Sequence, residues 1–261
     1  MREHHRRTIE KLVAEFENDP RFPALIIGGS IVRGLDKEDS DVDIILVASE
    51  EEYARRHPNR DLWLLSHDFT DYPGGYVDGK ILDLAFIRDV AAKGSEPARS
   101  AFQGAFLAYN HIPELPALME QIPVFQEQER QEKMERFYSR VQLLNWFVGE
   151  AEKRDNLYLL RQSTTEMVLF GGRLILEYNR ILFPNHKWLM YKLQQAPEKP
   201  VDMLELADKL LRNPTKESAE AFRNCINNFR DWGVDYMTAL VTFVEDDEWA
   251  WRTRRPPLSD W

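Results

Sequence analysis

The chain has 261 residues, of which 43% are hydrophobic and 30% are charged, values typical of a soluble protein with one large core or two smaller ones. Its formal net charge of −10 argues against a protein that binds along a nucleic-acid backbone, and no apolar run is long enough to span a bilayer. The single cysteine, Cys225, excludes an internal disulfide bond and suits a reducing cytoplasm. We therefore expect a cytoplasmic protein, and the absence of a spanning run predicts no membrane association.

The first half of the chain is predicted to mix helices and strands. Apolar residues at helical spacing predict helices, and short apolar or alternating runs predict strands. The expected helices are 3–17, 30–34, 50–57 and 97–109, and the expected strands are 24–27, 41–47 and 62–66. Residues 75–87 are predicted to form two strands joined at Asp78-Gly79, because this residue pair favours a tight turn.

Beyond about residue 125 the apolar residues step by three and four, which indicates long amphipathic helices. The expected long helices cover 134–151, 157–181 and 222–243, with shorter ones at 186–194 and 201–212. A helical bundle is the simplest way to bury their apolar faces. We therefore expect an α+β protein with a small mixed-sheet domain at 1–125 and an all-α bundle domain at 126–261.

Two carboxylates stand within the predicted strand 41–47. Residues i and i+2 of a strand point to the same face, so Asp41 and Asp43 should lie side by side. Two like charges at this distance repel, and burying them without a partner costs several kcal/mol. A divalent cation would relieve that cost, and Mg²⁺ prefers carboxylate oxygens together with substrate phosphates.

A glycine turn precedes these acids, with ten residues between Ser30 and Asp41. Gly28 and Gly29 allow the backbone to approach a phosphate closely. The helix expected after Ser30 would offer free N–H groups, and Ser30 would cap that helix or donate to a phosphate. Together the turn and the acids predict a site for a nucleoside triphosphate with its metal.

A third carboxylate is expected at Asp83, which stands in the apolar run Ile81–Ile87. A buried aspartate is costly there unless it has a role. If its strand lies beside the strand of Asp41 and Asp43, the three carboxylates converge. Asp83 would then bind the metal or take a proton from an attacking hydroxyl.

The glycine turn, the interval and the Asp-Val-Asp-Ile run resemble the nucleotidyltransferase superfamily of the DNA polymerase β type. Its pattern is a glycine turn followed, at about this distance, by an Asp-x-Asp or Asp-x-Glu pair between apolar residues. The helical second half is similar to that of antibiotic nucleotidyltransferases, the aminoglycoside adenylyltransferases among them. The motif covers one short segment and Asp83, whereas the architecture covers most of the chain.

This resemblance implies transfer of a nucleoside monophosphate, AMP from ATP in the first instance, to a small hydroxylated acceptor such as an aminoglycoside. It implies that Asp41, Asp43 and Asp83 bind Mg²⁺ and act in catalysis, with Asp83 as third ligand or general base. A glutamate is the base in some antibiotic-modifying relatives. It also implies that Gly28, Gly29 and Ser30 hold the triphosphate.

In the second half, the resemblance implies a triphosphate-binding lysine after the long helix, and Lys187 is our first candidate. Arg180 and His186 have the Arg-x5-His spacing of helical ribonuclease domains in toxin–antitoxin systems. Glu166 and Glu177 share one helix face, which indicates a solvated face or a site for a cationic acceptor.

Two further classes of function stay open. A nucleotidyltransferase of the toxin–antitoxin type would modify tRNA or a partner protein, and a non-catalytic module would only bind nucleotide. The intact acids and glycine turn argue against the non-catalytic module. The acidic balance favours a small acceptor over a nucleic acid.

Overall fold

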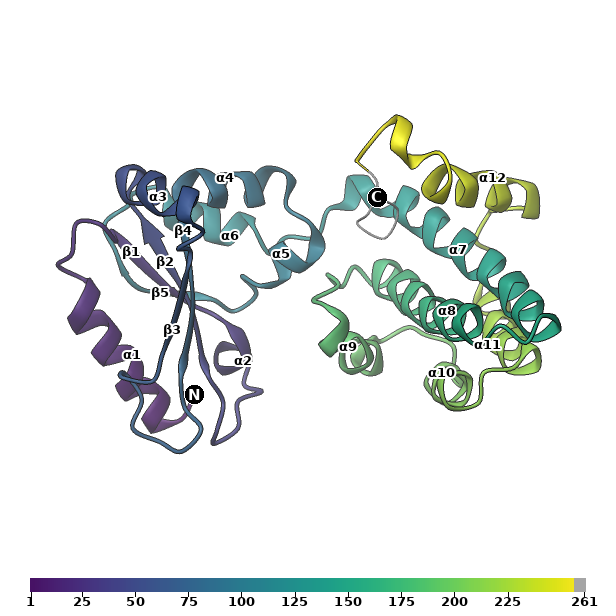
Figure 1. Cartoon of the computed structure of the whole chain (residues 1–261), viewed down its shortest axis with the longest axis horizontal. Helices are drawn as coiled ribbons and strands as arrows, with labels where there is room; N and C mark the ends of the chain where they lie inside the picture. The colour runs from purple at the N-terminus through teal and green to yellow at the C-terminus, as the bar shows by residue number, and fades with distance from the viewer. Residues whose placement is uncertain (256–261) are drawn as a thin grey trace. The chain divides into compact units, whose positions relative to one another are not determined.

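The computed structural model describes residues 1–255 and divides the chain into two compact units, Met1–Val124 and Phe125–Trp261 (Figure 1). The first unit contains a mixed sheet and the second is helical. The predicted α+β class is therefore confirmed. None of the helices described over residues 1–255 has the length and hydropathy that a membrane crossing requires.

The first unit is built around a five-stranded sheet in the order β3-β4-β2-β1-β5. Strands β2 and β4 are parallel, and the other neighbouring pairs are antiparallel. In chain order its elements are α1 (Glu3–Phe16), β1 (Ala24–Ile27), α2 (Gly29–Val32), β2 (Val42–Ala48), α3 (Glu50–Arg56), β3 (Trp63–Ser66), β4 (Val77–Asp83), α4 (Leu84–Lys93), α5 (Glu96–Ser100), β5 (Phe106–Asn110) and α6 (Leu115–Gln121).

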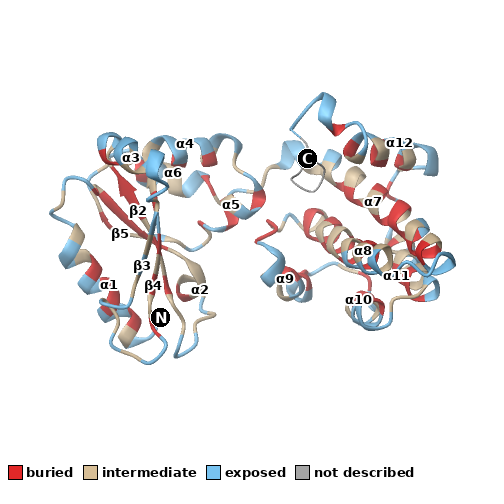
Figure 2. Cartoon of the chain, viewed as in Figure 1, coloured by how far each residue is buried: buried red, intermediate tan, exposed pale blue. Residues whose placement is uncertain are grey.

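Each face of the sheet has its own apolar core, because alternate residues of a strand point to opposite faces. On one face Leu12 of α1 packs with Ile44 of β2 and its neighbours. On the other face Val47 of β2 packs with Ile87 of α4 and with α6. Buried positions gather in the central strands (Figure 2). The helices on this second face cover only part of it, and the beginning of β2 and β4 carries polar residues instead.

The second unit packs its helices around one large core that includes Val141 of α7, Met167 of α8 and Phe222 of α11. Its elements are α7 (Glu127–Lys153), α8 (Leu157–Tyr178), α9 (Leu189–Gln195), α10 (Met203–Arg212), α11 (Lys216–Phe229) and α12 (Tyr236–Asp247). Short 3-10 turns at His186–Trp188 and Ala250–Arg252 precede α9 and follow α12.

Three predicted elements are wrong. The Asp78-Gly79 pair is no turn but part of the continuous strand β4, where a Cβ on Gly79 would stand 2.9 Å from Ile44 Cγ1 and 3.1 Å from Leu64 Cβ. The helix expected at 97–109 ends early, and β5 follows it. The helix expected at 222–243 is two helices, because the chain is extended at Arg230 and left-handed at Gly233.

Candidate functional site

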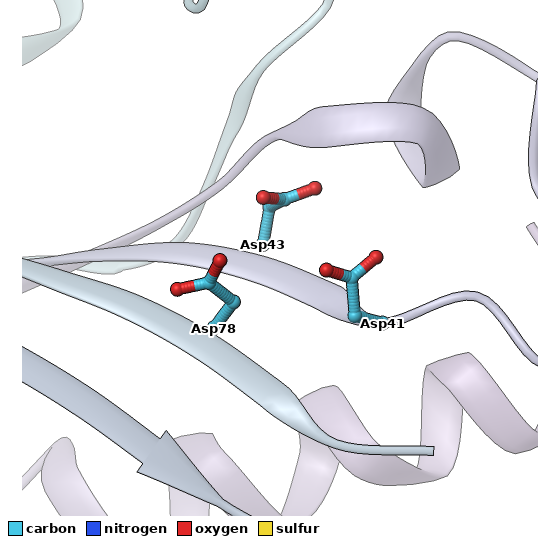
Figure 3. A group of neighbouring side chains, drawn as sticks. All are labelled: Asp41, Asp43 and Asp78. Carbon is cyan, nitrogen blue, oxygen red and sulfur yellow. The ribbon is translucent and has the colours of Figure 1, made fainter. Parts of the chain in front are cut away.

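Three carboxylates converge where β2 and β4 run side by side. Asp43 stands directly opposite Asp78 in the parallel strand pair, and Asp41 immediately precedes β2. One carboxylate oxygen of each residue lies within 4.8 Å of the others, and all three side chains are half-buried. Figure 3 shows them rising from the two adjacent strands to the same side. Among residues 1–255 this is the group whose donor atoms fit a metal ion.

The electrostatics of this carboxylate triad, Asp41, Asp43 and Asp78, call for a cation. Burial raises the pKa of Asp43, and the negative charges of Asp41 and Asp78 raise it further. Oxygen Oδ1 of Asp78 is buried and has no hydrogen-bond partner within residues 1–255. A buried acceptor without a partner is costly. The three carboxylates supply hard oxygen donors, and one of these oxygens has no partner among the described residues. Mg²⁺ takes oxygen ligands of this kind, so the residues fit that ion.

The glycine turn is shaped by Asp43. Gly29 adopts φ +73°, the left-handed region, and a Cβ on Gly29 would stand 1.7 Å from Asp43 Oδ2. The backbone N–H of Gly28 donates to the carbonyl oxygen of Asp43 over 3.0 Å. Any side chain at Gly29 would therefore displace the carboxylate, and the turn lies directly against the triad.

Ser30 has a different local role from the one we expected. Helix α2 is one short turn that begins at Gly29, its N-cap residue is Gly28, and no side chain caps it. The carbonyl oxygen of Ser30 accepts hydrogen bonds from the N–H groups of Arg33 and Leu35. The prediction that Ser30 caps the helix is therefore wrong, whereas its role toward a phosphate stays a prediction.

Two cations near the triad escaped the sequence analysis. Arg33 follows α2 and donates from Nη2 to the carbonyl oxygen of Ser100 over 3.0 Å. Burial lowers the pKa of Arg33, and the charge of Asp43 opposes this change. The charges of Lys80 and Arg33 both work against the raised pKa of Asp43. Lys80 could have been found from the alternation of β4, which places it on the same face as Asp78; no sequence pattern marks Arg33.

Asp83 does not join Asp41 and Asp43. It ends β4 opposite Ala48, five positions along the strand pair from the Asp43–Asp78 pair. Five residues of a strand span about 16 Å. Its carboxylate instead caps α4, where Oδ1 accepts from the N–H of Phe86 over 2.8 Å. The expected convergence of Asp83 is thus corrected, since Asp78 occupies the third position and a helix cap explains why an acid ends this strand.

The candidates in the second unit differ in their surroundings. Lys187 lies in the 3-10 turn before α9, with its side chain exposed and Nζ 5.6 Å from the centroid of the Trp188 ring, and its role stays a prediction. Arg180 forms a two-pronged ion pair with Glu127 at 2.8 and 2.9 Å. Glu177 is fully buried, with Lys133 Nζ 3.8 Å away, so it does not belong to a solvated face.

Comparison with known proteins agrees with this geometry. Residues 9–97 match the sequence model of the family described as nucleotidyltransferase domain. The matched residues all lie within the N-terminal unit, which is therefore similar to a nucleotidyltransferase domain. The glycine turn and the three converging carboxylates all lie within the matched residues, and the match supports a transferase activity for the chain.

A comparison with curated proteins found no match. Among solved structures, the chain is similar to the crystal structure of a nucleotidyltransferase-like protein from Exiguobacterium sibiricum. The two share 13% sequence identity with a TM-score of 0.49, over 97% of this chain and 81% of that chain. The aminoglycoside adenylyltransferase resemblance is not among these findings, so the acceptor belongs to the proposal below.

Proposed function

We propose that the protein is a Mg²⁺-dependent nucleotidyltransferase that moves a nucleoside monophosphate, AMP from ATP, to a hydroxyl group of a small acceptor. A bond forms between the acceptor oxygen and the α-phosphorus, the bond from the α-phosphorus to the β-phosphate bridging oxygen breaks, and pyrophosphate leaves. The first acceptors to test are aminoglycoside-type antibiotics, because the motif and the helical second half resemble the enzymes that modify them.

One observation carries this proposal: three converging carboxylates include a buried oxygen, Asp78 Oδ1, without a partner in the described chain. In a strand pair with only a structural role this arrangement would lower stability, because it combines repulsion between like charges with a buried acceptor that has no partner. A resident cation and a phosphate-bearing substrate supply what the site lacks.

The residues have distinct roles in the proposed reaction. Asp41, Asp43 and Asp78 would hold Mg²⁺, which when bound neutralises charge on the phosphates. The backbone of Gly28 and Gly29 would lie against the triphosphate, where the absence of a Cβ permits close approach.

Ser30 is proposed to donate to the same phosphates, and Lys187 stays a candidate donor to the nucleotide. Lys187 carries a mobile point charge suited to phosphate. Its exposure leaves the ammonium group able to reach a ligand.

The proton of the attacking hydroxyl is proposed to go to Asp78. This residue is half-buried, and its Oδ1 is buried without a partner among the described residues. Oδ2 would accept the proton and Oδ1 would face the cation. Asp78 thereby takes over the role that the sequence suggested for Asp83.

The experiment is pyrophosphate release with Mg²⁺ and each of the four nucleoside triphosphates, across a panel of aminoglycosides and related antibiotics. Release that requires one acceptor and disappears in Asp43→Asn establishes the small-molecule reaction. If nucleotide binds but no small acceptor supports release, the proposed acceptor class is wrong. Labelled tRNA or labelled protein in a lysate would then support the toxin–antitoxin type of reaction.

A further inference from the structure

Two large apolar side chains are exposed on the edge strand beside the triad. Trp63 and Leu65 of β3 are 54% and 64% exposed. Leu65 stands directly opposite Asp78, and Trp63 stands opposite Lys80. Opposite residues of an antiparallel pair share a face, so both apolar side chains lie on the face that carries the carboxylates. An exposed tryptophan and leucine on an edge strand expose the sheet to aggregation unless they have a use.

These residues continue a row that crosses the sheet. The row runs from Gly28 of the glycine turn to Asp43 of β2, Asp78 of β4 and Leu65 of β3. Neighbouring strands lie about 4.8 Å apart, which places Leu65 one strand beyond Asp78 and Gly28 one strand on the other side of Asp43. The metal-binding acids therefore separate the glycine turn from the apolar pair.

The geometry of phosphoryl transfer indicates which substrate would lie at each end of this row. The attacking and leaving oxygens lie roughly in line on opposite sides of the phosphorus atom. If the β- and γ-phosphates lie over the glycine turn, as in the proposed function, the attacking hydroxyl approaches from the side of β4 and β3. The acceptor then rests over Leu65 and Trp63.

We infer that Trp63 and Leu65 form the acceptor subsite and bind a hydroxyl-bearing ring, such as a sugar, through its apolar face. This inference rests on the proposed function and adds the residues that select the acceptor. A flat indole and a branched aliphatic chain offer mainly apolar contact area, with the indole N–H as their single donor, so they recognise a ring face more than a particular polar group.

Trp63 and Leu65 together form a platform, and Lys80 contacts its indole ring. The Nζ of Lys80 lies 4.7 Å from the centroid of the Trp63 ring, a cation–π contact that favours one orientation of the indole. An indole that is already oriented loses less conformational entropy on binding. The same ammonium group puts a positive charge beside the platform, so an acceptor that carries amino groups would turn them away from Lys80.

The test uses methyl β-D-glucoside as a neutral ring probe with the full-length protein, Mg²⁺ and a non-hydrolysable ATP analogue. Saturation-transfer NMR reports protons of the probe that contact the protein. We expect a signal that falls at least about 5-fold in Trp63→Leu, which keeps an apolar side chain but loses the ring, and that survives in Trp63→Phe.

The matched control is Trp146→Leu, since Trp146 is 51% exposed and lies on α7. It should leave the signal unchanged. Absence of a signal with the unaltered protein, an equal loss in the Trp146 variant, or a Trp63→Leu protein that loses thermal stability rather than probe binding would each overturn the inference. Because this readout needs no turnover, it separates a wrong acceptor subsite from a wrong reaction.

Discussion

Asp43 and Asp78 stand directly opposite one another on the parallel strands β2 and β4, and Gly29 lies so close to Asp43 that no side chain fits between them. The first relationship pairs two negative charges across a strand boundary, which destabilises the sheet. The second leaves no room for a side chain at Gly29, so the glycine turn lies directly against one of those charges. Together the two relationships support the proposed cation site, and the following predictions test it.

The first prediction separates Asp78 from Asp83. Asp78→Asn should lower pyrophosphate release at least about 100-fold, because the amide can neither accept the proton nor offer the cation a charged oxygen. Asp83→Asn should keep nearly full activity, since asparagine caps a helix about as well as aspartate does. Parallel assays of the two variants under one set of conditions provide the measurement. Loss of activity in the Asp83 variant alone would restore Asp83 as the third carboxylate.

The second prediction concerns the glycine turn. Gly29→Ala should abolish transfer, because its Cβ would occupy the position of Asp43 Oδ2. The matched control is Gly34→Ala, where φ is +68° but a Cβ would meet nothing within 4 Å. An alanine in the left-handed backbone region costs roughly 1 to 2 kcal/mol of stability, so both variants should unfold at a lower temperature. Equal activity of the two variants would show that the approach of Gly29 to Asp43 has no catalytic role.

The sequence alone predicted the class of fold and the first two acids, for physical reasons that are clear in the structure. Strand periodicity places Asp41 and Asp43 on one face without knowledge of any neighbour. The third acid depends on which residue of β4 lies opposite Asp43, and register is a tertiary property that no local pattern fixes. Asp83 was chosen because an acid in an apolar run looks costly, whereas it caps a helix that begins inside that run.

The Asp78-Gly79 pair misled the prediction because its usual meaning is a hairpin turn. Here the glycine admits Ile44 and Leu64 into the space where its side chain would be, so the strand continues and Asp78 faces the site. The alternation of Val77, Gly79 and Ile81 with polar neighbours was the available signal for one strand. Helical spacing likewise continued across Gly233, although α11 and α12 are separate helices.

The third prediction tests Lys187. Lys187→Met should raise the KM for the nucleoside triphosphate about 10-fold, which corresponds to the loss of about 1.4 kcal/mol of binding free energy. Lys209→Met serves as the control, because Lys209 is also exposed but lies in the last turn of α10. Initial rates at varied nucleotide concentration give the measurement. An unchanged KM in the Lys187 variant would remove this residue from the nucleotide site.

The fourth prediction follows from the pKa of Asp43, which burial and the neighbouring acids raise above its ordinary value of 3.8. As the pH rises above 3.8, the unfolded chain releases this proton before the folded protein does, so the folded state loses stability through the window up to the raised pKa. Without metal, Asp43→Asn should therefore be as stable as the unaltered protein below that window and more stable at neutral pH. Relief of about 1 kcal/mol would raise the unfolding temperature by roughly 2 to 4 °C.

Excess Mg²⁺ should reverse this order. The unaltered protein gains stability by mass action, about 2.7 kcal/mol at 100 times the dissociation constant, whereas the variant has lost a charged ligand. Thermal unfolding from acid to neutral pH, with a chelator or with Mg²⁺, measures both effects. A variant that is less stable at neutral pH without metal would mean that Arg33 and Lys80 already compensate Asp43 in the folded protein. The triad would then be an internal ion network rather than a site that requires a cation.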